Sequence, residues 1–227
     1  MKIADFNPSY GISNPECNKD AADYRLTWKF MEGSHFMVCV HSKNDHIPLE
    51  EIKRRVEAEG YTDENLVTGQ NPVIENRDDN FLLYTVAEGT FFKQNRSYKL
   101  RSGNLQKGVL YQMDIYACEY DEDKQILTVY DSKKDQNVCY TKAKVVVSKK
   151  IKNSLFDNYA ICEIKVQPSE GFEDGSVVYT IDGVNGEFPL TEKCQGRTVY
   201  VRLPKHAQLH IKAADEYSKM ITVKVSE

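Results

Sequence analysis

The chain has 227 residues, of which 30 are Lys or Arg and 34 are Asp or Glu, so its formal net charge is −4. This small acidic excess removes the usual electrostatic basis for binding nucleic acid or an anionic membrane. Hydrophobic residues make up 41% and charged residues 28%, which is typical of a folded domain. No apolar run approaches the ~20 residues that span a bilayer, and Met1–Pro8 lacks the apolar stretch of a secretion signal. We therefore predict a soluble cytoplasmic protein with no nucleic-acid partner and no membrane insertion.

Cysteine usage favours the same compartment. The six cysteines are widely spaced and include no C-x-x-C pair: they are Cys17, Cys39, Cys118, Cys139, Cys162 and Cys194. Without an export signal, free thiols in a reducing compartment are favoured over a disulfide framework. A structural zinc site would also need local cysteine pairs, so we predict no metal and no cofactor.

Regular structure is predicted to begin near residue 24. Residues 1–23 are rich in Asn, Pro, Ser and Asp and have little periodicity, which predicts an irregular N-terminal arm. From Tyr24 to Phe30, and again from Phe36 to His41, alternate residues are apolar. A period of two with one apolar face predicts two half-buried strands that form a hairpin.

The next segment has the spacing of a helix. Leu49, Ile52 and Val56 fall on one helical face, and Glu–Arg pairs four residues apart occupy the other. Pro48 suits the first turn, and Gly60 is able to terminate the helix. We predict that this helix covers an edge or end of a sheet in its own domain, with a partner-binding helix as the alternative.

A long polar connection and a series of β-rich runs follow. Residues 61–79 contain several Gly, Asn and Pro residues and predict a loop of the length that is sometimes functional. Four further runs predict strands in the same domain: 81–86, 109–117, 125–130 and 138–147.

The basic, polar interval 149–154 is the predicted domain boundary, which gives domains of residues 24–150 and 151–227. Beyond it the pattern changes to short β-rich runs separated by turns that contain Gly. These runs are 159–166, 177–181, 187–190, 198–203, 209–213 and 220–225. Short strands at regular spacing with no helix predict a small sandwich or open barrel.

One stretch of the first domain resembles a known family. Leu105 lies six residues before Tyr111, and Met113, Ile115 and Ala117 then continue a two-residue alternation. This resembles the corner-and-strand motif of fibronectin type III domains. In that motif the Tyr packs inward while its hydroxyl bonds to upstream backbone.

The segments 26–28 and 36–38 are similar to that family's Trp-bearing strand and the strand after it. The resemblance implies a mostly β protein built from tandem Ig-like and fibronectin type III-like β-sandwiches with one inserted helix. The first sandwich would be fibronectin type III-like and carry the helix, and the second would be a small Ig-like sandwich. The fold alone does not assign an activity.

No known catalytic motif is present. The phosphate-loop and dinucleotide fingerprints, the G-x-S-x-G elbow and H-E-x-x-H are all missing from the sequence. Cys39 and His41 share a strand face with His35, which allows a Cys–His nucleophilic pair as an alternative. Neighbouring side chains on one strand face are about 6–7 Å apart, so an ordinary strand face is favoured.

Three polar groups are alternatives for metal binding. His206 and His210 lie on one predicted strand face but need a third ligand from elsewhere. The acidic segments 78–79 and 121–123 offer calcium ligands but do not follow the D-x-D-x-D-G pattern. Solvated polar surfaces are the favoured interpretation of all three.

The aromatic content provides the predicted binding residues. The chain has 14 Tyr, 9 Phe and 1 Trp. If Met113 and Ile115 point inward, then Tyr116 and Tyr120 point outward, and Tyr130 on a neighbouring strand can join them. An exposed Tyr platform can anchor a protein partner or stack on sugars, whereas the β-propensity of Tyr also explains the pattern without any ligand.

These observations predict a non-catalytic protein-interaction or scaffold protein that binds through sheet faces, loops or strand edges. The alternative is a carbohydrate-binding or carbohydrate-active protein, such as one associated with a glycoside hydrolase. Protein binding predicts an apolar patch with a polar rim, whereas glycan binding predicts coplanar exposed rings. An enzyme predicts a deep pocket with perturbed carboxylates or histidines.

Overall fold

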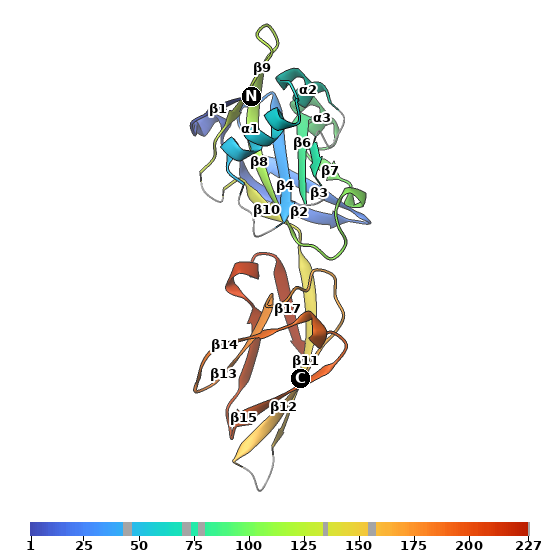
Figure 1. The fold of residues 1–227 in the computed structure, drawn as a ribbon, viewed down its shortest axis with the longest axis vertical. Helices are drawn as coiled ribbons and strands as arrows, with labels where there is room; N and C mark the ends of the chain where they lie inside the picture. Colours follow the sequence, from blue (N-terminus) through green and yellow to red (C-terminus); the bar gives the residue numbers. More distant parts are fainter. Residues whose placement is uncertain (43–46, 70–73, 77–79, 134–135, 154–157, 227) are drawn as a thin grey trace. The chain divides into compact units, whose positions relative to one another are not determined.

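The computed structural model describes residues 1–42, 47–69, 74–76, 80–133, 136–153 and 158–226. The chain forms two compact units. Met1–Gln106 and Leu110–Thr141 make up unit 1, and Lys107–Val109 and Lys142–Glu227 make up unit 2. The described residues are mostly β and form several separate sheets (Figure 1). None of the helices among them has the length and apolar character needed to cross a membrane.

Unit 1 contains a large sheet, a small sheet and short helices. The large sheet has the order β1-β9-β8-β4-β6-β5, with β10 paired to β8, and the small sheet has the order β2-β3-β7. The large-sheet strands are β1 (Lys2–Ala4), β4 (His35–Ser42), β5 (Ile74–Asn76), β6 (Phe81–Ala87), β8 (Tyr111–Asp121), β9 (Ile126–Tyr130) and β10 (Val138–Tyr140). The small-sheet strands are β2 (Ser13–Asp20), β3 (Asp23–Lys29) and β7 (Tyr98–Leu100). The helices are α1 (Leu49–Ala58), α2 (Asp63–Thr68), α3 (Glu88–Lys93) and the 3-10 turns η1 (Pro8–Tyr10) and η2 (Ser102–Asn104).

The large sheet is covered on both faces. On one face, Met37 and Cys39 pack with buried residues of α1 and α2. On the other face, Phe36 meets Trp28 of the small sheet, with ring centroids 5.3 Å apart. β4 is consequently buried without a break from Phe36 to Val40, as expected of a strand with no solvent-facing side.

The one predicted helix is present as α1, which Figure 1 shows lying across strands of the large sheet. The structure also has α2 and α3, and the segment 61–79, which predicts a loop, contains α2 and β5. Pro48 precedes it in an extended conformation, and Gly60 follows it with a φ of 76°. Ile52 and Val56 are fully buried and belong to the same core cluster as Leu66 of α2. The helix thus covers a sheet of its own unit, which is the interpretation that the narrow apolar face favoured.

The N-terminal segment is more regular than its composition predicts. β1 pairs in parallel with β9, and β2 pairs antiparallel with β3. β2 is an edge strand in which only Cys17 is buried, and it carries a β-bulge between Ser13 and Glu16. Its main chain is held by ladder hydrogen bonds while its side chains stay mostly polar, so two-residue alternation does not reveal it.

Unit 2 contains a four-stranded sheet and a three-stranded sheet, with orders β15-β12-β11-β17 and β14-β13-β16. The first comprises β11 (Ala143–Asn153), β12 (Tyr159–Val166), β15 (Thr198–Pro204) and β17 (Ile221–Ser226). The second comprises β13 (Val177–Ile181), β14 (Val184–Leu190) and β16 (Leu209–Ala213). The 3-10 turns are η3 (Glu192–Cys194) and η4 (Asp215–Tyr217). All six predicted short strands of this region are present, and among its described residues there is no α-helix.

The division between the units falls at Thr141 and Lys142, whereas the sequence places the boundary after residue 150. The basic interval that suggested this boundary is the second half of β11. Its residues 149–153 pair with residues 160–164 of β12. Lysines at exposed strand positions therefore produced the composition change.

The predicted corner at Tyr111 is present in the structure. The Tyr111 ring is buried, and the backbone N–H of Gln106 donates a hydrogen bond to its hydroxyl oxygen at 2.8 Å. This contact fastens the segment before β8 to the start of the strand. The inward ring and the upstream hydrogen bond are the local contacts that the resemblance implies for Tyr111.

We expect the substitution Tyr111→Phe to lower the free energy of unfolding by about 1 kcal/mol, since the Gln106 N–H loses its acceptor while the ring still packs. Chemical denaturation measures this change. Tyr61→Phe removes an exposed hydroxyl from the same unit and should change stability by less than about 0.5 kcal/mol. Equal effects of the two substitutions would show that the corner hydrogen bond contributes nothing specific.

Candidate functional site

The structure corrects the prediction that Tyr116 faces outward. Tyr116 is only 5% exposed and belongs to the cluster that packs under α1 and α2. The two-residue alternation on β8 predicts one core face and one solvent face. Because the large sheet is covered on both faces, the second set of side chains is buried as well. Tyr116 is therefore a core residue and is not available as a surface contact.

The structure does not bring Tyr120 and Tyr130 together. Tyr120 is half-buried and packs against the cluster under the helices. Leu127 and Val129 of β9 face that same cluster, so Tyr130 points to the opposite side of the sheet. Its ring stacks on Tyr10 at a centroid distance of 3.7 Å and an interplanar angle of 4°. The three predicted contact residues thus do not form a shared platform.

The Cys39–His41 pair lies in the core, where both residues are fully buried. Burial raises the pKa of the Cys39 thiol well above its ordinary value, and the charge of Asp114 adds to this effect. A nucleophilic cysteine acts as the thiolate. The local environment therefore opposes the chemistry that the Cys–His alternative requires.

His41 instead forms a buried hydrogen-bonded pair with Asp114. Its Nε2 lies 2.9 Å from Asp114 Oδ2, and its Nδ1 lies 3.0 Å from the carbonyl oxygen of Ser42. Because a carbonyl oxygen only accepts, Nδ1 is the donor to Ser42, and a second hydrogen bond joins Nε2 to Oδ2. Gln112 Nε2 donates to the other oxygen, Oδ1, at 2.8 Å. The network joins β4 to β8 inside the core.

The candidate metal ligands remain separate. His210 Nε2 is 3.1 Å from Asp182 Oδ1 at an exposed position, and His206 lies outside β16 with a φ of 70°. A hydrogen bond from a lysine of the same turn lowers the pKa of Asp121. Asp78 and Asp79 lie outside the described residues. Across the ranges that the structure describes, no three His, Cys, Asp or Glu side chains gather to hold a metal ion.

Four aromatic side chains of unit 1 line a groove of about 780 Å³ between the β2–β3 end of the small sheet and α3. We call this the aromatic groove. Trp28 and Phe91 form its buried floor and stack with ring centroids 4.2 Å apart. Phe30 adds an edge-on ring 5.9 Å from Phe91. Above this floor, Phe92 is 43% exposed and Met31 is 77% exposed.

Polar and charged residues surround this apolar floor. The lining includes Asn14 and Glu16 of β2, Lys29 of β3, Glu88 of α3 and Arg96. The Arg96 guanidinium carbon lies 5.3 Å from the Phe92 ring centroid, a cation–π distance that holds the ring at the rim. The aromatic groove therefore combines exposed apolar groups with a rim of both charge signs.

Sequence reasoning did not identify this groove. α3 has six residues, too few to show a helical period, so the neighbouring Phe91 and Phe92 give no amphipathic signal. The groove also joins segments far apart in the chain, near residues 14, 28 and 92. The one available signal is Met31, a large apolar residue that lies between the two predicted strands of the first hairpin.

Comparison with known proteins adds no assignment, since the chain matches no known family and shows no significant similarity to a curated protein sequence. The function must therefore be argued from the site itself.

None of the six cysteines forms a disulfide, and only Cys194 is part-exposed; the other five are buried. Burial also raises the pKa of Cys118 to about 12. We expect one thiol of the native protein to react quickly with a disulfide reagent at mildly alkaline pH, and all six to react after unfolding. Cys194→Ser should remove the fast phase. If two or more thiols of the native protein reacted quickly, the result would contradict the burial of the other five cysteines.

Asp114→Ala should lower the free energy of unfolding by about 3 kcal/mol, because it leaves a buried His41 donor without its acceptor. The double substitution His41→Leu with Asp114→Leu removes both partners and should cost less than Asp114→Ala alone. Chemical denaturation of both variants measures the difference. A double variant less stable than the single one would show that the pair itself supplies net stability.

Proposed function

We propose that this chain is a non-catalytic protein-interaction protein whose unit 1 binds apolar side chains of a protein partner in the aromatic groove. The observation that carries the proposal is the exposure of Met31 and Phe92 beside a stacked aromatic floor. Large apolar groups exposed together inside a polar rim are typical of protein-binding surfaces. Aromatic residues and Met are also enriched at such surfaces.

The surroundings of the reactive groups support a non-catalytic role. Cys39 and His41 lie in the core, and Asp114 is hydrogen-bonded to both His41 and Gln112. A substrate would have to open the covered sheet to reach them. The aromatic groove itself includes no His or Cys among its described lining residues.

The arrangement of rings favours protein binding over the carbohydrate alternative. Glycan binding needs ring faces that are open to a sugar. Tyr130 and Tyr10 cover one another's faces at 3.7 Å, and Tyr179 and Phe188 stack at 5.2 Å. In the aromatic groove Trp28 and Phe91 cover one another, and the exposed Phe92 ring meets Phe91 at a steep angle of 70°. This supports a site for branched or aromatic side chains more than a flat sugar platform.

We also propose that the two units are modules related to fibronectin type III and Ig-like sandwiches, arranged in tandem. The Gln106–Tyr111 hydrogen bond supports this for unit 1, and the two sheets of four and three strands support it for unit 2. Such modules commonly serve as binding scaffolds, and their specificity resides in local surfaces.

A peptide-display library panned on the whole chain tests the proposed function. We expect selected peptides to be rich in apolar and aromatic residues. Fluorescence anisotropy should show at least about tenfold weaker binding to the double variant Met31→Ser with Phe92→Ser, since burial of each side chain contributes about 1–2 kcal/mol.

Tyr200→Ser is the matched control, because Tyr200 is 67% exposed and lies in unit 2. It should leave peptide affinity unchanged. Peptides that bind the double variant as tightly as the native chain would reject the aromatic groove. A reproducible glycan-array signal with no selected peptide would favour the carbohydrate alternative.

A further inference from the structure

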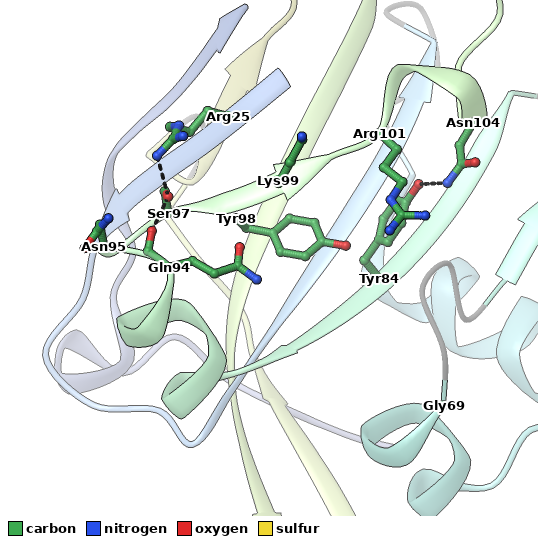
Figure 2. A pocket seen from close by; sticks show the side chains of 10 residues that line it. All are labelled: Arg25, Gly69, Tyr84, Gln94, Asn95, Ser97, Tyr98, Lys99, Arg101 and Asn104. Atoms are coloured by element: carbon green, nitrogen blue, oxygen red, sulfur yellow. Dashed lines mark hydrogen bonds between the residues drawn. The ribbon is translucent and has the colours of Figure 1, made fainter. Parts of the chain in front are cut away.

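Unit 1 has a second concave site, separate from the aromatic groove, which we call the basic cleft. It has a volume of about 680 Å³ and is lined by side chains from β3, β6 and β7 and from the turns on either side of β7 (Figure 2). Three of its lining residues are cations, namely Arg25, Lys99 and Arg101. Among its lining residues that the structure describes, none is an Asp or Glu.

The three cations differ in how far they are already neutralised. Arg25 pairs with Asp20 at 2.9 Å, and Lys99 pairs with Asp23 at 3.0 Å. Arg101 forms no ion pair with any residue in the described part of the chain. Its guanidinium offers several N–H donors in a planar fork, which suits a carboxylate or a phosphate.

Tyr98 contributes a second donor that has no partner. The residue is only 6% exposed, yet within the described ranges no group forms a hydrogen bond with its hydroxyl. Figure 2 shows the ring between Gln94 on one side and Tyr84 and Arg101 on the other. Burial raises the pKa of Tyr98, and the positive charge of Arg101 acts in the opposite direction. The hydroxyl is therefore a protonated donor held close to a cation.

The amide groups complete the polar lining. Asn104 Nδ2 donates to the Tyr84 hydroxyl at 3.2 Å, which fixes both groups at the Arg101 end of the basic cleft. Arg25 and the Gln94 carbonyl are joined through the Ser97 hydroxyl at the other end. Most of these side chains are therefore held in place before any ligand arrives, which lowers the entropic cost of binding.

We propose that the basic cleft binds a small organic oxyanion, a phosphate ester or a polycarboxylate, whose anionic group pairs with Arg101 and accepts a hydrogen bond from the Tyr98 hydroxyl. The volume lies within the range of about 300–1,000 Å³ that is typical of small-molecule sites. Because Lys99 and Arg25 are already paired with Asp23 and Asp20, Arg101 is the main source of positive charge for the ligand. The neutral groups Gln94, Asn95 and Asn104 supply hydrogen bonds to hydroxyl or amide groups of the ligand.

Isothermal titration calorimetry of the whole chain with adenosine monophosphate, citrate and inorganic phosphate tests this proposal. We expect saturable binding of at least one organic anion, tighter than that of inorganic phosphate and weaker at higher salt. Stronger binding of adenosine monophosphate would assign a phosphate ester, and stronger binding of citrate would assign a polycarboxylate. Either result supports the basic cleft as an oxyanion site.

Two variants locate the binding. Arg101→Gln should weaken the affinity by about 10-fold or more, as expected for loss of a charged hydrogen-bonding partner. Tyr98→Phe should weaken it by about 3- to 10-fold, since it removes one hydrogen bond to an anion. Arg101 is exposed, and Tyr98→Phe keeps the ring, so both variants should fold.

Lys144→Gln is the matched control, because it removes one exposed positive charge from unit 2 and leaves the same net charge as Arg101→Gln. It should leave the affinity unchanged. Absence of saturable binding for all three anions would overturn the proposal. Equal weakening by Arg101→Gln and Lys144→Gln would also overturn it, because binding would then follow net charge and not the basic cleft.

Discussion

The burial of both faces of the large sheet is the constraint on which the rest of unit 1 depends. α1 and α2 cover one face, and the small sheet covers the other through contacts such as Trp28 with Phe36. Neither covering layer has enough apolar surface to stand alone: α1 has ten residues and β7 has three. The layers therefore stabilise each other through the large sheet, and its central strands carry side chains that never meet water.

The burial of both sheet faces limits where polar side chains of unit 1 can reach solvent. Two polar side chains buried on the central strands, His41 and Asp114, are hydrogen-bonded to each other, and Ser42 and Gln112 supply their further partners. The same burial keeps Cys39 as a neutral thiol. The groups that line the aromatic groove and the basic cleft lie at the margins of the layers, where the small sheet ends against α3 or against the turn after β7. Both proposed sites of unit 1 therefore draw on residues from more than one layer.

The sequence predicts elements whose signal is local and misses those whose signal depends on other layers. The α1 spacing and the Tyr111 corner are local patterns, and both are present. Tyr116 is buried because a helical layer covers its face of β8. The two-residue alternation of apolar side chains does not show whether a second layer covers that face. β2 is held by backbone pairing on a polar edge, so its side chains give little information. Both concave sites join distant segments, and single-chain periodicity carries no information about such neighbours.

The turn between α3 and β7 explains why the two sites lie so close in the chain. Asn95 and Arg96 both have left-handed φ values, 58° and 57°, a conformation that costs about 1–2 kcal/mol for a residue with a side chain. The Arg96 N–H donates to the carbonyl of Phe91 at 3.0 Å, and the Ser97 hydroxyl caps the carbonyl of Gln94. These bonds offset the strain and fix the direction of successive side chains. Asn95 then lines the basic cleft and Arg96 lines the aromatic groove. One strained turn thus supplies a polar group to each site, which is consistent with strain being retained where side chains must be aimed.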